Sequence, residues 1–197
     1  MRLSNVSPRR ARLGAAALIV TLTAALVGCG THDLILKVDI LSFIHELQTP
    51  ILVPDTPAIP GGIATGEQNV VASDVNLVSG LGSAGEVKGV SLRLRSVANA
   101  TTGTATDTLR VYMSTASLPE ASPVILQVMN LVAGTPDTVT TLVDNDPRLT
   151  ALFKNDVVHV RVTTSGRGPS SGANLTGASL RFVALDAVVT AGKKPNL

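Results

Sequence analysis

The stretch that decides the fold class is residues 87–97, VKGVSLRLRSV. At its centre, apolar and polar residues alternate one by one: Val90, Ser91, Leu92, Arg93, Leu94 and Arg95. Successive side chains of a β-strand point to opposite faces of a sheet. The pattern therefore predicts a strand with one face in a core and the other in water.

The same alternation recurs along the rest of the chain. Further strand candidates cover residues 70–78, 109–113, 124–132, 139–143, 158–162 and 175–189, the last either continuous or broken at Gly177. Segments rich in Gly, Pro, Ser and Asp separate them at hairpin length. Seven or eight such strands predict an all-β fold, an antiparallel β-sandwich like a jelly roll.

Residues 146–153, DPRLTALF, depart from this alternation. Asp146 is a residue type that caps helix N-termini, and Pro147 suits the first helical position. Three apolar residues follow at spacings that place them on one helical face. We expect one short helix here that covers the core.

The segment before the sandwich fits two patterns. Residues 34–47, LILKVDILSFIHEL, alternate as a strand does but also show helical spacing, and we expect a strand as far as about Ile44. Four prolines and a Gly-Gly pair follow by residue 62, which removes backbone donors. We therefore predict a first strand and a proline-rich linker or loop over 34–62, the sandwich domain over 63–192, and a tail over 193–197.

Charge and composition argue against nucleic-acid binding. The chain has 16 basic and 14 acidic residues, but four arginines precede Cys29 in a stretch without acidic residues, so the chain from Cys29 onward carries a net charge of −2. Aromatic residues make up only 2% of the chain. A protein without a basic surface or rings for stacking lacks both usual means of binding nucleic acid.

Residues 1–28 are organised as an export signal. A basic head over residues 1–14 precedes an uncharged apolar run, AAALIVTLTAALVG, over residues 15–28. A run of about fourteen residues is short for a hydrocarbon core of roughly 30 Å. This favours a signal peptide over a permanent transmembrane helix.

The run ends in Leu26-Val27-Gly28-Cys29, followed by Gly30. This tetrapeptide resembles the lipobox of bacterial lipoproteins. The resemblance implies a diacylglycerol on the sulfur of Cys29, cleavage after Gly28, and an acyl chain such as palmitate on the new N-terminus. Residues 29–33 would then be a lipidated N-terminus and short tether. Gly30 in place of aspartate implies the outer membrane, where the organism has one. The alternatives are an uncleaved anchor helix and an ordinary signal peptide with a chance cysteine.

Residues 80–85, GLGSAG, match the glycine fingerprint of dinucleotide-binding folds, with Asp107 about twenty residues further on. That fingerprint requires a helix after the glycines. Residues 86–97 are predicted to be a strand, so we interpret the glycines as a hairpin loop. We predict no cofactor.

The three histidines, His32, His45 and His159, belong to no hydrolase or zinc-protease motif. We expect His159 on the solvent face of its strand, and we predict that the protein is not an enzyme. The alternative, an enzyme without recognisable motifs, requires His45 or His159 within hydrogen-bond reach of a carboxylate and a nucleophile.

Oxygen-bearing side chains gather around the predicted helix, where Asp144, Asp146 and Asp156 are candidate calcium ligands. Their spacing matches no EF-hand, and helix capping already explains Asp146. We therefore predict no metal.

A candidate ligand patch consists of Tyr112, Arg93, Arg95 and Arg110. Alternation places Tyr112 outward, and the four side chains would meet if their strands pair. An exposed ring beside arginines is a surface on which a sugar could stack.

These observations together predict an exported protein that a lipid anchors to the bacterial cell envelope. We expect its β-sandwich to have a non-catalytic, structural or protein-interaction role, with another envelope protein as partner. The alternative is a module that binds an envelope glycan or another ligand.

Overall fold

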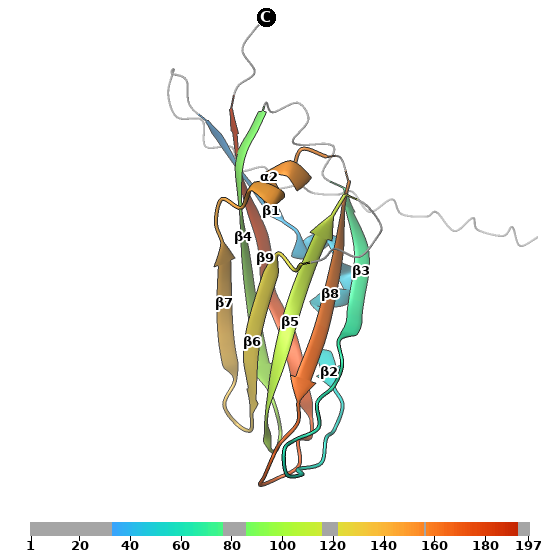
Figure 1. The fold of residues 1–197 in the computed structure, drawn as a ribbon. Helices are drawn as coiled ribbons and strands as arrows, with labels where there is room; N and C mark the ends of the chain where they lie inside the picture. The colour runs from blue at the N-terminus through green and yellow to red at the C-terminus, as the bar shows by residue number, and fades with distance from the viewer. Residues whose placement is uncertain (1–32, 77–85, 116–121, 156, 193–197) are drawn as a thin grey trace, which may run out of the picture.

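The computed structural model describes residues 33–76, 86–115, 122–155 and 157–192. Two antiparallel β-sheets pack face to face in this part of the chain (Figure 1), which confirms the all-β sandwich. One sheet has the order β1-β9-β4-β7, with β2 also paired to β9, and the other has the order β3-β8-β5-β6.

The first sheet consists of β1 (Leu34–Asp39), β2 (Ile51–Val53), β4 (Glu86–Asn99), β7 (Asp137–Val143) and β9 (Ala178–Gly192). The second consists of β3 (Gln68–Asn76), β5 (Thr104–Ser114), β6 (Ile125–Val132) and β8 (Val157–Arg167). The described residues thus form nine strands, one more than the upper end of the expectation, because the short β2 was not predicted.

The alternation that predicted β4 is confirmed in its burial. Val90, Leu92 and Leu94 are fully buried, whereas Arg93 and Arg95 are exposed. The predicted helix is also present as α2 (Pro147–Leu152), which packs against β4. The Asp146 carboxylate accepts a hydrogen bond from the amide of Arg148, as expected of an N-cap.

Three inward-facing polar residues divide the interior into two apolar clusters. Ser96, Asp107 and Gln127 are each at most 4% exposed, and Ser96 Oγ donates to Gln127 Oε1 at 2.5 Å. On one side lies a large cluster of Leu, Val and Ile, which includes Leu94 and Leu109. The smaller cluster on the other side contains Ala98, Ala100, Ala105, Met129, Leu131, Leu175, Ala178 and Leu180.

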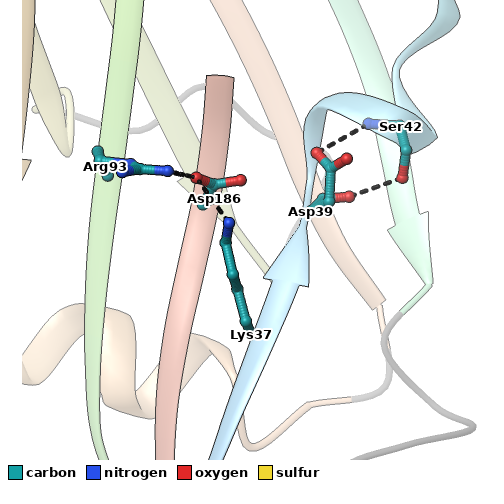
Figure 2. Close-up of polar contacts among 5 residues, drawn as sticks. All are labelled: Lys37, Asp39, Ser42, Arg93 and Asp186. Atoms are coloured by element: carbon teal, nitrogen blue, oxygen red, sulfur yellow. Dashed lines mark hydrogen bonds and ion pairs between the residues drawn. The ribbon is translucent and has the colours of Figure 1, made fainter. Parts of the chain in front are cut away.

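The segment after β1 differs from the prediction. The strand ends at Asp39 and not near Ile44, and two short 3-10 helices follow, η1 (Leu41–Phe43) and η2 (His45–Gln48). Ser42 explains the turn, because its amide donates to Asp39 Oδ1 at 3.3 Å and its hydroxyl donates to the Asp39 carbonyl at 2.8 Å (Figure 2). Ile44 is thereby turned into the core, where it is completely buried.

The proline-rich stretch also differs from a simple linker. Residues 51–53 form β2, which pairs antiparallel with the first residues of β9. The next contact is a β-bridge between Thr56 and Leu175. Both β1 and β2 therefore lie along the same edge of β9, one near each end of that strand.

We predict that Leu94→Ala lowers the free energy of unfolding by about 2–5 kcal/mol, because it opens a cavity in the larger cluster. Leu142→Ala, at a side chain that is 64% exposed, should change it by less than about 0.5 kcal/mol. Urea unfolding of both variants measures these differences. Equal effects of the two variants would contradict the assigned core.

Candidate functional site

A cavity of about 390 Å³ lies between β2 and the neighbouring end of the four-stranded sheet. Its walls include the apolar side chains of Ile51, Val53, Val70, Ala105, Leu131 and Leu175. Three of its lining residues carry charge: Glu46, Asp107 and Arg167. The alanine-rich cluster borders this space, because small side chains fill less of the interior between the sheets.

Asp107 is the most buried of the charged residues in the cavity wall. Its exposed fraction is 4%, and it follows Ala105 on the inward face of β5. The amide of Thr108 donates to Asp107 Oδ1 at 2.7 Å. Burial raises the pKa of this carboxyl, and the backbone amides of Thr108 and Ser165 together with the charge of Arg110 oppose that rise.

A glycine lies opposite this carboxyl. Gly166 of β8 pairs with Asp107 across the sheet. A Cβ at Gly166 would lie 3.5 Å from Asp107 Oδ1 and 3.0 Å from the Thr106 carbonyl oxygen. A side chain at position 166 would therefore crowd the backbone of β5, and glycine allows β8 to pass close to Asp107.

The cavity is remote from the end of the sandwich where the described chain begins. Leu34, the first residue of β1, pairs with Ala191, whereas Ile51 in the cavity wall pairs with Leu180. Ala191 and Leu180 are separated by roughly 36 Å along β9, at the usual rise of a strand.

The prediction that Tyr112, Arg93, Arg95 and Arg110 form one ligand patch is wrong. Arg93 and Arg95 lie on β4 in one sheet, whereas Arg110 and Tyr112 lie on β5 in the other. Alternation indicates which face a residue occupies but not which strands pair, and β5 pairs with β6 and β8 instead.

Tyr112 is also covered and not exposed. Arg161 lies directly opposite on β8, with its guanidinium carbon 4.2 Å from the ring centroid. The Tyr112 hydroxyl donates to Glu67 Oε1 at 3.0 Å, and only 6% of the residue is accessible. Burial and the Glu67 carboxylate raise the pKa of the hydroxyl. The ring face is thus already occupied by Arg161 and offers no platform to a sugar.

Two of the three arginines of the predicted patch have partners of their own. Arg93 donates from Nε to Asp186 at 3.1 Å, and Lys37 Nζ lies 3.5 Å from the same carboxylate (Figure 2). These contacts join β1, β9 and β4 across the outer face of the sheet. Arg110 Nη1 donates to Ser165 Oγ at 2.6 Å.

The candidate calcium ligands do not come together in the described residues. Asp144 accepts a hydrogen bond from Ser91, and Asp146 caps α2 and binds Arg148. Hydrogen bonding to Arg148 lowers the pKa of Asp146. Asp156 lies outside the described residues, and among those that are described no group of three His, Cys, Asp or Glu could hold a metal.

Of the histidines, His159 forms a hydrogen bond through Nδ1 with the carboxylate of Asp74 on the outer face of the four-stranded sheet, and His45 lies on η2. His32, the GLGSAG glycines and the lipobox residues Leu26, Val27, Gly28 and Cys29 lie outside the described residues. Where the structure does describe the chain, it contains no helix long and apolar enough to cross a membrane.

Asp107 was not predicted as a site residue, although the sequence contains a signal for it. It stands between Ala105 and Leu109, at an inward position of an alternating strand. A carboxylate at a core position is costly to bury, so such a break in the pattern indicates a site.

We predict that the contribution of Asp107 to the free energy of unfolding falls as pH rises from the ordinary Asp value of 3.8 to the higher pKa of this carboxyl in the folded chain. In this range the folded chain holds a proton that the unfolded chain has released. Asp107→Asn should remove this dependence, so the variant gains stability relative to the native protein as pH rises. Urea unfolding over pH 3.5–8 measures the difference. A difference that does not vary with pH would contradict the burial of this carboxyl.

No protein-family profile matches the chain, and no curated protein matches it. Among solved structures, chains of infectious bursal disease virus show a limited similarity to the backbone of this chain. The Gt strain gives a TM-score of 0.40 at 11% identity, covering 85% of this chain and 37% of that chain. The Gx strain gives 0.40 at 9% identity, with the same coverage of 85% and 37%. This chain thus spans little more than a third of the length of the viral chains, and a likeness at this level carries no argument about function.

Proposed function

We propose that this protein is a lipid-anchored protein of the bacterial cell envelope, with a non-catalytic β-sandwich that has a structural or protein-interaction role. The observation that carries the proposal is the sequence Leu26-Val27-Gly28-Cys29 after an apolar run. Two or more acyl chains on one residue hold a protein stably on a bilayer, since each buried methylene contributes about 0.8 kcal/mol.

The described body is compatible with attachment at Cys29. It begins at Asp33, four residues after the cysteine, and β1 begins at Leu34. A tether this short holds the start of β1 near the bilayer. The cavity beside β2, roughly 36 Å further along β9, then lies on the side facing away from the membrane.

An edge strand with a long uncharged stretch supports the interaction role. β7 lies at the edge of its sheet, beside β6, and residues 138–143, TVTTLV, contain no charged residue, glycine or proline. Thr138, Thr140 and Leu142 are exposed. Edge strands usually carry charges, prolines or bulges that block pairing, so β7 is suited to accept a strand from a partner protein.

The cavity supports the second candidate function, binding of a small ligand. A volume of about 390 Å³ lies within the usual range for ligand sites, roughly 300–1,000 Å³. The lining also combines apolar side chains with polar ones such as Thr65, Gln68 and Thr164, and polar groups in a pocket fix the orientation of a ligand. The cavity, and no longer the Tyr112 patch, is where we place this function.

We predict that Cys29→Ser abolishes incorporation of labelled fatty acid and leaves the leader uncleaved, because serine provides no thiolate for the lipid. Metabolic labelling and mass spectrometry of the N-terminus measure both. Ser42→Ala, which leaves the cysteine untouched, is the control. Normal labelling of the Cys29→Ser variant would refute the anchor.

We predict that a photo-crosslinking residue at Leu142 captures an envelope protein in intact cells, and that one at Val188 does not. Both positions are exposed on the same sheet, at 64% and 39%, but Val188 lies on the inner strand β9. Thr140→Lys should reduce the Leu142 product at least severalfold, because a charge on the edge opposes strand addition. Equal amounts of crosslinked product from Leu142 and Val188 would contradict docking at β7. A Leu142 product whose amount does not change in the Thr140→Lys variant would contradict it as well.

A further inference from the structure

We propose that the cavity beside β2 binds a small organic cation with an apolar body, such as an amine, and that the carboxylate of Asp107 receives its charged group. The proposal rests on the second candidate function, ligand binding, and does not depend on the lipid anchor. It adds the chemical class of the ligand and the residue that selects it.

The charge of the site favours a cation. Asp107 takes part in no ion pair within 4 Å among the described residues. Arg110, the nearest cation on its own strand, is directed to the outer face and donates to Ser165. Glu46 and Arg167 are the other charged residues that line the cavity, so two acidic groups face one basic group.

The walls favour an apolar body. Ala105, Leu131 and Leu175 line the inner part of the cavity and are each at most 7% exposed. Together with Ile51 and Val53 they would surround the hydrocarbon part of a ligand. Asp107 and Gly166 both line the cavity, so a cationic group inside it would reach the carboxylate past a residue without a side chain.

An anion is disfavoured by the positions of the charges. Arg167 is exposed at the end of β8, whereas Asp107 is 4% exposed at the inner wall. An anionic group that entered as far as Asp107 would meet a carboxylate with no intervening cation. A cation in the same place gains a charge-assisted hydrogen bond in an environment of low dielectric constant.

The test uses the full-length protein, purified from cells and held in lipid nanodiscs. Its methyl groups are labelled with ¹³C. Three probes of similar shape differ in charge: 2-phenylethylammonium, neutral 2-phenylethanol and anionic 3-phenylpropionate. We expect the ammonium to shift the methyl resonances of Leu131 and Leu175 saturably, and not those of Leu94 in the larger cluster. The alcohol should bind at least about tenfold more weakly, because it lacks the charged partner.

Asp107→Asn keeps the shape of the side chain and removes its charge. It should weaken binding of the ammonium at least about tenfold and leave binding of the alcohol unchanged. Asp74→Asn, the same change on the outer face of the four-stranded sheet, should leave both unchanged. Should Asp107→Asn fail to fold, the pH dependence of the native protein replaces it: binding of the ammonium should weaken as pH falls through the pKa of Asp107, which burial raises. Glu46→Gln should retain that dependence, which distinguishes Asp107 from the other carboxylate of the cavity.

The failures of the two proposals are distinguishable. Equal affinity for the ammonium and the alcohol, or highest affinity for the anion, would refute the proposal that the ligand is a cation. The proposal that the cavity binds a ligand would still stand. No saturable shift with any probe would refute both. An ammonium preference that survives in Asp107→Asn would refute the role of this carboxylate.

Discussion

The pairing of β4 with β9 is the constraint on which the rest of the structure depends. The two strands pair from Glu86 and Gly192 to Asn99 and Ser179. A slip by one residue would exchange the faces of β4 and place Arg93 and Arg95 in the core. The register also brings Arg93 opposite Asp186, so that their ion pair forms on the outer face.

The register of this pairing shifts twice, between Val87 and Gly89 and between Arg95 and Ser96, and the second shift is a bulge in β9. Arg95 pairs with Ala184 and Ser96 pairs with Phe182, so Val183 is the extra residue on β9. Val183 is exposed, and Phe182 and Leu185 on either side of the bulge are both buried. Phe182 and Leu185 are three residues apart, so in a strand without a bulge strict alternation would direct one of these two large side chains to solvent. The bulge therefore keeps both ends of β9 in the core.

The alternation of apolar and polar residues predicts which side chains of a single strand are buried. It does not predict which strands pair or which side chains meet across them. The burial of β4, the inward valines of β8 and the cap of α2 follow from local sequence. β2 has only three residues, too few for any periodicity. The end of β1 is set by hydrogen bonds from Ser42 to Asp39, which interrupt an otherwise continuous apolar pattern. The cover over Tyr112 depends on Arg161, about fifty residues away in sequence, and no local pattern indicates it.

The polar layer inside the sandwich connects stability to function. Ser96 and Gln127 bond to each other, which offsets part of the free energy that their burial costs. Within the described residues, Asp107 in the same layer has only backbone amides as hydrogen-bond partners, and a buried carboxylate so placed destabilises the fold. The larger cluster of Leu, Val and Ile supplies the stability that tolerates it. The alanine-rich cluster borders the cavity that Asp107 lines, the site of the proposed ligand. A sandwich selected for stability alone would place an apolar residue at position 107 and larger side chains at Ala98 and Ala105, so the sequence favours an open, acidic cavity over a closed core.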